Sequence, residues 1–267
     1  MSDVVTRNPA RQKLAAGELV LCMGLRQART ADIAMIAASC GFDSIYVDME
    51  HSPVSLETTS TICIGALGAG ITPLVRVPGH DLDMATRVLD GGALGVIFPQ
   101  VETAAQAESM VAACRYPPQG NRSVMGAGPS LGYRPIPLGE VNATLNADTL
   151  LIVMLETAGG IASADAIAAV DGVDCLLIGS NDLSTALGIP GDLRHARVRD
   201  AFARTAAACD AHGKILGIGG VRGDLELQAE LVRMGGRFII AGSDVTYLAT
   251  AARNDAMALR ALGAAKP

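Results

Sequence analysis

Aromatic residues and clustered positive charge, on which nucleic-acid binding depends, are scarce in this sequence. Its 267 residues include no tryptophan, and aromatic residues make up 3% of the chain. Because bases and sugar rings stack on aromatic side chains, we expect no such platform here. The net charge is −6, and the 21 lysines and arginines are scattered rather than gathered in a basic stripe. These absences argue against a nucleic-acid partner.

Long apolar runs and closely spaced cysteines are missing as well. Half of the residues are hydrophobic, but no unbroken apolar segment reaches the roughly 18 residues that cross a bilayer, so we expect no membrane partner. The first residues, MSDVVTRNPARQKLAAGE, lack the apolar core of a signal peptide and resemble an initial helix. The six cysteines form no Cys-x-x-Cys pair, which indicates buried thiols in a reducing compartment. We therefore expect a soluble, cytoplasmic protein.

Eight short apolar segments alternate with alanine-rich stretches of helical periodicity. Each is rich in valine, isoleucine and leucine and is too short for a globular helix, as is typical of parallel strands buried on both faces. Eight such strands predict a (β/α)8 (TIM) barrel, one α/β domain over residues 1–267, with a doubly wound open sheet as the alternative. The expected strands are 19–24, 44–48, 72–77, 94–100, 150–156, 175–179, 214–219 and 237–242.

The segment between the fourth and fifth expected strands is too long for a simple crossover. Residues 116–136 contain many glycines and prolines and show no apolar period. This composition predicts a long ordered loop or a lid. A short helix is expected to follow it over residues 138–148.

Polar residues follow the carboxyl ends of the expected strands. In a (β/α)8 barrel these ends meet on one rim, where the chemistry takes place, whereas the opposite end serves stability. We therefore expect these polar side chains to converge on one site. They are Asp48, His51, Arg76, Gln100, Glu102, Glu156, Asn181 and Asp182.

Glu156 and Asp182 follow neighbouring strands and are the candidate metal ligands. Two adjacent carboxylates repel each other unless a cation or a proton lies between them. Oxygen ligands without a nearby cysteine favour a hard divalent ion such as Mg²⁺ or Mn²⁺. Two protein ligands would leave coordination positions for a chelating 2-keto acid. The alternative is structural, with Asp182 capping a helix that starts at Leu183 and Glu156 as a solvated acid.

Arg76 and His51 are the candidates for charge stabilisation and proton transfer. A guanidinium stays protonated and can hold an enolate oxygen, although Arg76 could instead form a structural ion pair with Asp48. Histidine side chains titrate near neutral pH, so His51 could move a proton, with Asp48 or Glu50 fixing its tautomer. The alternative is a histidine that is merely exposed in a loop. No role is assigned to the remaining histidines, His80, His195 and His212.

Six segments of the sequence, taken in order, match the pattern of a known family. They are GFDSIYVDMEHSP, PLVRVPGHD, VLDGGALGVIFPQVETAAQA, CRYPPQGNRSV, VMLETAGGI and GVDCLLIGSNDLSTALG. The match extends from about residue 19 to about residue 250 without large gaps. The chain thereby resembles the HpcH/HpaI family of metal-dependent, class II pyruvate aldolases, which act on 4-hydroxy-2-oxoheptanedioate or 2-keto-3-deoxy sugar acids.

The resemblance implies an activity and a role for each site residue. The reaction is the reversible retro-aldol cleavage of a 4-hydroxy-2-keto acid to pyruvate, or a related 2-keto acid, and an aldehyde. The cofactor is a divalent ion, Mg²⁺, Mn²⁺ or Co²⁺. The implied roles are metal binding by Glu156 and Asp182, enolate stabilisation by Arg76, acid–base catalysis by His51, and support of that histidine by Asp48 and Asp90.

The resemblance also implies an assembly. Family barrels exchange a C-terminal helix between subunits and form hexamers, as trimers of dimers. The apolar tail DVTYLATAARNDAMALRALGAA at residues 244–265 is consistent with such an exchange.

The sequence departs from the family pattern around the expected keto acid. Met154 stands where a glutamine is common, and Ser180 and Asn181 replace a proline and an alanine. Together with Arg76 and Asp182, these three residues are the expected substrate contacts. The departures concern the identity of the substrate more than the type of reaction.

The loop after the first expected strand adds two arginines, Arg26 and Arg29. These could bind a carboxylate at the far end of the substrate. Such a contact would also bear on which substrate is used.

Other activities remain open at this stage. One keeps the metal but changes the reaction, to oxaloacetate decarboxylation or to citryl-CoA or malyl-CoA cleavage. Another is a non-catalytic barrel that binds a keto acid. A Schiff-base aldolase is not expected, because Lys214 is the only lysine near a strand and lies at its start, the wrong end for catalysis.

Overall fold

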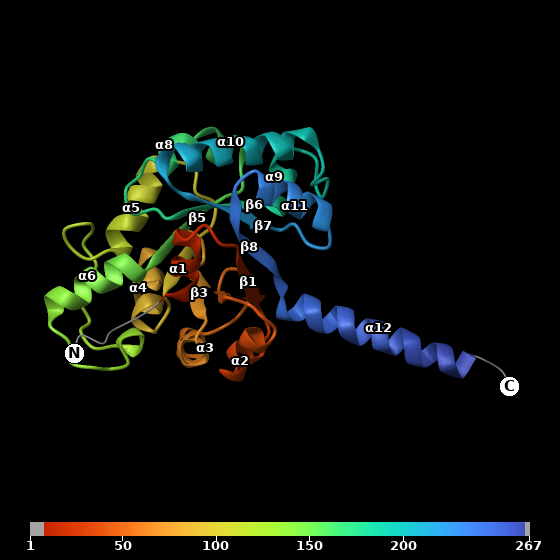
Figure 1. Ribbon diagram of the computed structural model, residues 1–267, viewed down its shortest axis with the longest axis horizontal. Helices are drawn as coiled ribbons and strands as arrows, with labels where there is room; N and C mark the ends of the chain where they lie inside the picture. The colour runs from red at the N-terminus through yellow and green to blue at the C-terminus, as the bar shows by residue number, and fades with distance from the viewer. Residues whose placement is uncertain (1–7, 265–267) are drawn as a thin grey trace.

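The computed structural model describes residues 8–264 and contains a closed barrel of eight parallel strands (Figure 1). Each strand pairs with the next, and the eighth pairs with the first. The (β/α)8 prediction is confirmed, and the open-sheet alternative is wrong. The strands lie within two residues of the expected bounds, at β1 (Val20–Leu25), β2 (Ser44–Asp48), β3 (Thr72–Arg76), β4 (Gly95–Phe98), β5 (Leu150–Leu155), β6 (Cys175–Gly179), β7 (Ile215–Gly219) and β8 (Gly236–Ser243).

Helices surround the barrel, and local sequence signals set their ends. Before α3, for example, the Ser55 side chain accepts the Thr58 backbone N–H, and Gly70 ends the helix at a φ of 75°. The helices are α1 (Pro9–Ala15), α2 (Asp32–Ser39), α3 (Leu56–Ala69), α4 (Leu82–Asp90), α5 (Ala104–Cys114), the 3₁₀ turn η1 (Pro129–Leu131), α6 (Leu138–Asp148), α7 (Ala158–Ala162), α8 (Ala164–Ala168), α9 (Ser180–Ala186), α10 (Ala196–His212), α11 (Leu225–Arg233) and α12 (Asp244–Ala264).

The initial helix closes the amino-terminal end of the barrel. Ala10 and Leu14 of α1 pack against the side chains that fill the barrel interior. Asn8 caps α1 and donates hydrogen bonds from Nδ2 to the carbonyl oxygens of Leu94 and Asp148. The expected helix is therefore present at residues 9–15, and residues 1–7 of that expectation lie outside the described residues.

The long segment between β4 and β5 contains η1 and ends in α6, whose bounds match the predicted 138–148. Tyr116 and Leu131 of this segment pack against α6. The segment leaves the carboxyl end of α5 and therefore lies at the amino-terminal end of the barrel. The lid interpretation is wrong for this chain, because the rim is at the other end.

The cysteines confirm the expectation of buried thiols with one exception. Five are buried, but Cys40, which ends α2, is exposed. No helix within residues 8–264 is both long and apolar enough to cross a membrane.

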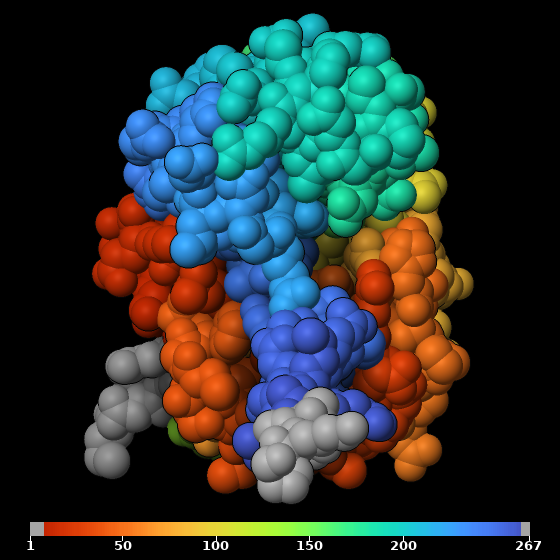
Figure 2. Space-filling view, turned by 90° about the vertical axis from the view of Figure 1, so that its right-hand side faces the viewer, coloured from red at the N-terminus to blue at the C-terminus, as the bar shows by residue number. Residues whose placement is uncertain are grey.

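The helix α12 extends away from the barrel (Figure 1), and Figure 2 shows it projecting toward the viewer. Its apolar side chains Leu248, Met257, Leu259 and Leu262 are exposed. Exchange of this helix between subunits and assembly into a hexamer therefore remain predictions, and residue 265 of the expected tail lies outside the described residues.

Candidate active site

A cavity of about 280 Å³ opens at the carboxyl ends of the strands. It brings together seven of the site residues predicted from the sequence. They are His51, Arg76, Met154, Glu156, Ser180, Asn181 and Asp182.

The two candidate metal ligands contact each other in this cavity. Glu156 directly follows β5 and is buried, and Asp182 lies in the first turn of α9. Burial and a hydrogen bond with Asp182 raise the pKa of Glu156 from 4.5 to about 7. Two carboxylates this close need either a shared proton or a cation between them, so the pair fits a divalent ion. Asp182 is not the residue that caps the helix, because α9 already begins at Ser180 after Gly179.

The chain supplies few metal ligands beyond this pair. Across residues 8–264, no group of three or more histidine, cysteine, aspartate or glutamate side chains is placed to hold a metal ion. A cation held by Glu156 and Asp182 would therefore keep most of its coordination positions for water or substrate.

The backbone around Glu156 is shaped to hold its carboxylate. A Cβ at Gly179 would lie 2.7 Å from Glu156 Oε2, so only glycine leaves room for the acid. Gln100 has a φ of 54°, which is uncommon outside glycine, and its N–H donates to Glu156 Oε1 at 3.0 Å. His80 Nε2 lies 3.0 Å from the Pro99 carbonyl oxygen and 3.2 Å from that of Gln100. His80, which had no role in the sequence analysis, thus contacts the turn that aims Gln100 at Glu156.

Arg76 is fixed on two sides by acids. Its Nε and Nη2 donate to the two oxygens of Asp48 at 3.0 and 2.6 Å, and its Nη1 lies 3.1 Å from Glu50 Oε2. Burial raises the pKa of Asp48, but the hydrogen bonds and charge of Arg76 outweigh it, so the net pKa lies below its ordinary value. The ion pair given above as the structural alternative is therefore present. It also fixes the guanidinium, whose Nη1 lies 3.9 Å from Met154 Sδ, against the cavity.

His51 is exposed, and its ring faces Glu50 rather than Asp48. Its Nε2 lies 3.7 Å from Glu50 Oε2, whereas Asp48 Oδ1 accepts the His51 backbone N–H at 3.1 Å. Within this chain the aspartate therefore holds the backbone of the histidine, and the glutamate lies near its ring. Glu50, which with Asp48 was one of two candidates to fix the tautomer of His51, contacts both His51 and Arg76.

Asp90 lies far from this cavity. It is the last residue of α4, at the amino-terminal end of the barrel, and its Oδ1 accepts a hydrogen bond from Arg122 Nη2 at 2.6 Å. Asp90 and His51 therefore do not meet within this chain. Support of His51 by Asp90 would require a second subunit and stays a prediction.

Two further arginines line the cavity. Arg26 donates from Nε to Asp48 Oδ2 at 2.9 Å, whereas Arg29 bonds to the carbonyl oxygens of Arg26 and Ala28 and does not line the cavity. Arg222, in the loop after β7, lies 5.4 Å from the centre of the Tyr247 ring. Sequence reasoning missed Arg222, although its place just after a strand-ending Gly-Gly pair was a usable signal.

Ser180 also lines the cavity with an unused hydrogen-bonding group. Its hydroxyl is fully buried and has no hydrogen-bond partner among the described residues. A buried polar group without a partner is costly, so this hydroxyl is available to a bound ligand.

Comparisons with known proteins show the family to which the chain belongs. The model of the HpcH/HpaI aldolase/citrate lyase family matches residues 25–251. A 4-hydroxy-4-methyl-2-oxoglutarate aldolase of Hapsidospora irregularis is 40% identical over 97% of both chains. A hydroxypyruvate/pyruvate aldolase of Roseobacter denitrificans is 35% identical over 90% of this chain and 93% of its own. The crystal structure of an HpcH/HpaI aldolase from Desulfitobacterium hafniense superposes with a TM-score of 0.89 at 29% identity, covering 94% of this chain and 96% of that one.

The family match extends over β2 to β8 and includes both Glu156 and Asp182. The chain therefore belongs to the HpcH/HpaI aldolase/citrate lyase family and is a lyase of the aldolase type.

Proposed function

We propose that this protein reversibly cleaves a 4-hydroxy-2-oxo acid to pyruvate, or a related 2-keto acid, and a carbonyl product. The proposed cofactor is a divalent cation, Mg²⁺, Mn²⁺ or Co²⁺, held by Glu156 and Asp182. The observation that carries the proposal is the contact of the buried Glu156 carboxylate with the Asp182 carboxylate, beside the buried Arg76. When bound, the cation would supply positive charge that polarises the keto acid.

Arg76 is the proposed stabiliser of the enolate. Breaking the bond between C3 and C4 leaves the electron pair on the three-carbon fragment, as an enolate with negative charge on oxygen. A guanidinium fixed by Asp48 and Glu50 is already oriented and needs no rearrangement to meet that charge. Because arginine does not lose its proton, its contribution persists throughout the reaction.

His51 is the proposed acid–base residue. In the cleavage direction the ring takes the proton of the C4 hydroxyl as the bond between C3 and C4 breaks. A proton is then delivered to C3, which becomes the methyl group of pyruvate. Glu50, 3.7 Å from Nε2, is placed to orient the ring during both transfers.

The arginines at the rim favour a substrate with a second carboxylate. Arg222 forms no ion pair with an acid among the described residues, yet it lines the cavity. The 40% identical relative bears the name of an enzyme for 4-hydroxy-4-methyl-2-oxoglutarate, a keto acid with a distal carboxylate. We therefore assign Arg222, with Arg26, to that carboxylate, whose geometry a guanidinium matches.

Two other activities share parts of this site. Oxaloacetate decarboxylation would pass through the same enolate and is expected as a side activity. Citryl-CoA or malyl-CoA cleavage and non-catalytic keto-acid binding are the remaining alternatives, and assays with these substrates separate them.

The test is a retro-aldol assay with 4-hydroxy-4-methyl-2-oxoglutarate, in which pyruvate release is followed by lactate dehydrogenase. We expect activity that EDTA removes and Mg²⁺, Mn²⁺ or Co²⁺ restores. Borohydride with pyruvate should trap no adduct, since Lys214 lies at the opposite end of the barrel with its Nζ bonded to the Val170 and Val173 carbonyl oxygens. Activity that survives metal removal, or a lysine adduct, would refute the proposal.

A further inference from the structure

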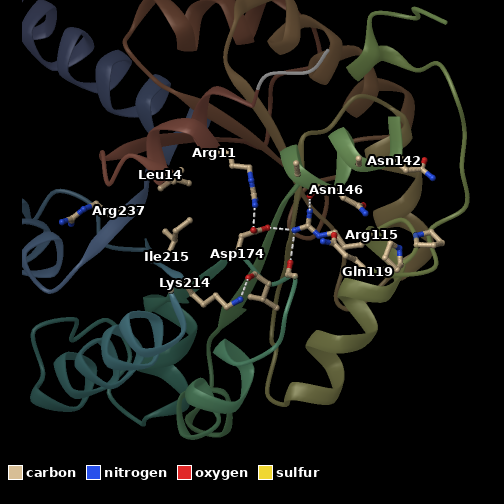
Figure 3. A pocket seen from close by; sticks show the side chains of 18 of the residues that line it. Arg11, Leu14, Arg115, Gln119, Asn142, Asn146, Asp174, Lys214, Ile215 and Arg237 are labelled. Atoms are coloured by element: carbon tan, nitrogen blue, oxygen red, sulfur yellow. Dashed lines mark hydrogen bonds and ion pairs between the residues drawn. The ribbon is translucent and has the colours of Figure 1, made fainter. Parts of the chain in front are cut away.

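Aspartates fix arginines at both ends of the barrel. A cavity of about 1030 Å³ lies at the amino-terminal end, bounded by α1, α6 and the turns that lead into β6, β7 and β8 (Figure 3). Figure 3 shows Arg11 and Arg115 pointing toward Asp174 from two sides, and they donate to its two oxygens at 2.7 and 2.6 Å. At the rim, Asp48 accepts two hydrogen bonds from Arg76 in the same way.

Asp244, the first residue of α12, is an acid beside the rim that pairs with no cation among residues 8–264. Its Oδ1 accepts the backbone N–H of Arg26 at 2.9 Å. Its Oδ2 accepts those of Gln27 and Ala28 at 2.8 and 2.7 Å. Hydrogen bonds to an ionised carboxylate are stronger than those between neutral groups. One side chain therefore binds three consecutive amides of the loop after β1, which lies far from it in sequence.

The start of α12 does not depend on Asp244 as its cap. Ser243 Oγ accepts the Thr246 N–H at 3.4 Å, and Thr246 Oγ1 accepts the Ser243 N–H at 2.9 Å. This reciprocal pair satisfies the helix end much as a capping box does. Within its own helix Asp244 accepts only the Val245 N–H, at 2.8 Å. Most of its hydrogen bonds therefore go to the loop and not to the helix.

The loop that Asp244 binds begins with Arg26, whose side chain lines the active-site cavity. Arg26 is held from both ends, because its backbone N–H is bonded to Asp244 and its Nε donates to Asp48 Oδ2 at 2.9 Å. Its Nη1 and Nη2 form no hydrogen bond or ion pair with the residues that the structure describes. A guanidinium with its Nη atoms open matches the oxygens of a carboxylate.

We propose that Asp244 is a positioning residue for substrate recognition, which holds Arg26 where its guanidinium meets the distal carboxylate of the substrate. This inference rests on the proposed function, which assigns Arg26 to that carboxylate. Asp244 does not line the cavity itself, so it acts on the affinity for the substrate and not on the bond that breaks. A loop that is ordered before the substrate arrives reduces the entropy lost on binding.

Asp244→Asn tests the proposal. The amide keeps the size of the side chain, but its nitrogen is a donor and cannot accept a backbone N–H. The loop therefore loses the bonds on one side of the group. We expect KM for 4-hydroxy-4-methyl-2-oxoglutarate to rise about fivefold with kcat nearly unchanged. KM for 4-hydroxy-2-oxopentanoate, which has no distal carboxylate, should not change.

Asp81→Asn is the matched control. The Asp81 side chain also accepts a backbone N–H, that of Met84 at 2.8 Å, where it caps α4. It does not line the cavity and bonds to no arginine there. The same chemical change at this position should leave both KM values as in the parent chain.

A double variant shows whether Asp244 acts through Arg26. Arg26→Gln removes the guanidinium, so KM for 4-hydroxy-4-methyl-2-oxoglutarate should rise about tenfold. In that background Asp244→Asn should cause no further rise, because the group that it positions is gone. If the two effects multiply instead, Asp244 acts on a different group and the proposal is overturned.

Hydrogen exchange followed by mass spectrometry measures the loop without any assay of activity. In the parent chain the amides of residues 26–28 should be protected, because each donates to Asp244. Asp244→Asn should speed their exchange about tenfold, whereas Asp81→Asn should not. Unprotected amides in the parent chain would overturn the proposal, whether or not the Asp244 variant folds.

The proposed function and the role of Asp244 can fail separately. A parent chain that cleaves no substrate in the presence of a divalent metal refutes the proposed function. An active parent in which Asp244→Asn leaves KM unchanged, or raises it equally for both substrates, refutes only the role of Asp244.

Discussion

The two ends of the barrel arrange their charges in different ways. At the carboxyl rim, the carboxylates of Asp48 and Glu50 fix the guanidinium of Arg76 beside the cavity. The carboxylates of Glu156 and Asp182 face each other there. At the amino-terminal end, cations outnumber acids, and Lys214 and Arg237 donate to backbone carbonyl oxygens. The rim therefore pairs acids with a buried arginine, whereas Lys214 and Arg237 at the opposite end are paired with backbone oxygens.

The two ends of the barrel therefore serve different purposes, preorganisation of the site at the rim and stability at the amino-terminal end. A preorganised site needs charged groups whose orientation is fixed before substrate arrives, and the rim provides this with buried ion pairs. The amino-terminal end instead satisfies backbone groups and closes the barrel with α1. Substitutions at the two ends should accordingly act on different measurable quantities.

The largest effect is expected for Glu156→Gln. Loss of the carboxylate removes a proposed metal ligand, so we expect retro-aldol activity to fall by about 10³-fold or more. Calorimetric titration with Mg²⁺ should show no binding at the site. Glu102→Gln is the matched control, since that acid follows the neighbouring strand but does not line the cavity, and unaltered Mg²⁺ binding by Glu156→Gln would refute the ligand assignment.

His51→Ala should have the next largest effect, a decrease of about 10²-fold in the rate of proton transfer. Metal affinity should survive, because the ring does not contact the acidic pair in the structure. Steady-state kinetics and Mg²⁺ titration of the same preparation measure the two quantities. Normal turnover would show that a different group transfers the proton.

Asp48 and Glu50 should differ in what they change. Removing Asp48 leaves Arg76 buried without its main partner, so Asp48→Ala should destabilise the protein by about 3 kcal/mol in urea unfolding. Glu50→Gln should leave stability nearly intact and instead shift the pH profile of kcat, because Glu50 faces the His51 ring. If Asp48→Ala instead shifts the pH profile and Glu50→Gln lowers stability, Asp48 is the partner of the His51 ring.

Arg222→Gln tests the substrate class. We expect KM for 4-hydroxy-4-methyl-2-oxoglutarate to rise about tenfold with little change in kcat. A substrate without the distal carboxylate, 4-hydroxy-2-oxopentanoate, serves as the control and should show an unchanged KM. An equal rise for both substrates would remove Arg222 from the distal site.

The smallest expected effect concerns pH and the metal-free protein. The pKa of Glu156 is raised from 4.5 to about 7, so the folded state holds this proton more tightly than the unfolded chain does. This contribution to the free energy of unfolding should therefore fall as pH rises from 4.5 to about 7 and then stay constant. Urea unfolding across this range measures it, and Glu156→Gln should remove this component. A slope of opposite sign would contradict the raised pKa.

The fold could be predicted because each strand is a continuous apolar run with both faces buried. The rim residues could be predicted as well, because the carboxyl ends of parallel strands in a barrel all lie on one side. Their partners could not be predicted in the same way. The sequence left Asp48 open as a partner of either His51 or Arg76, and the register of β2 and β3, which sequence spacing does not reveal, sets it opposite Arg76.

Other features depend on contacts between distant segments. The positive φ of Gln100 and its bond to Glu156 arise from the packing of two loops, and no local sequence signal indicates them. The amino-terminal cavity combines Arg11, Arg115 and Arg237, which lie far apart in sequence. Only the closed barrel brings them together.

The exchange of pyruvate methyl protons in D₂O, followed by NMR, tests the central proposal that Glu156 and Asp182 hold a cation which makes enolate formation possible. We predict exchange by the Mg²⁺-loaded protein, none after metal removal or in Glu156→Gln, and slow exchange in His51→Ala. Exchange that continues at the full rate in Glu156→Gln would contradict the account.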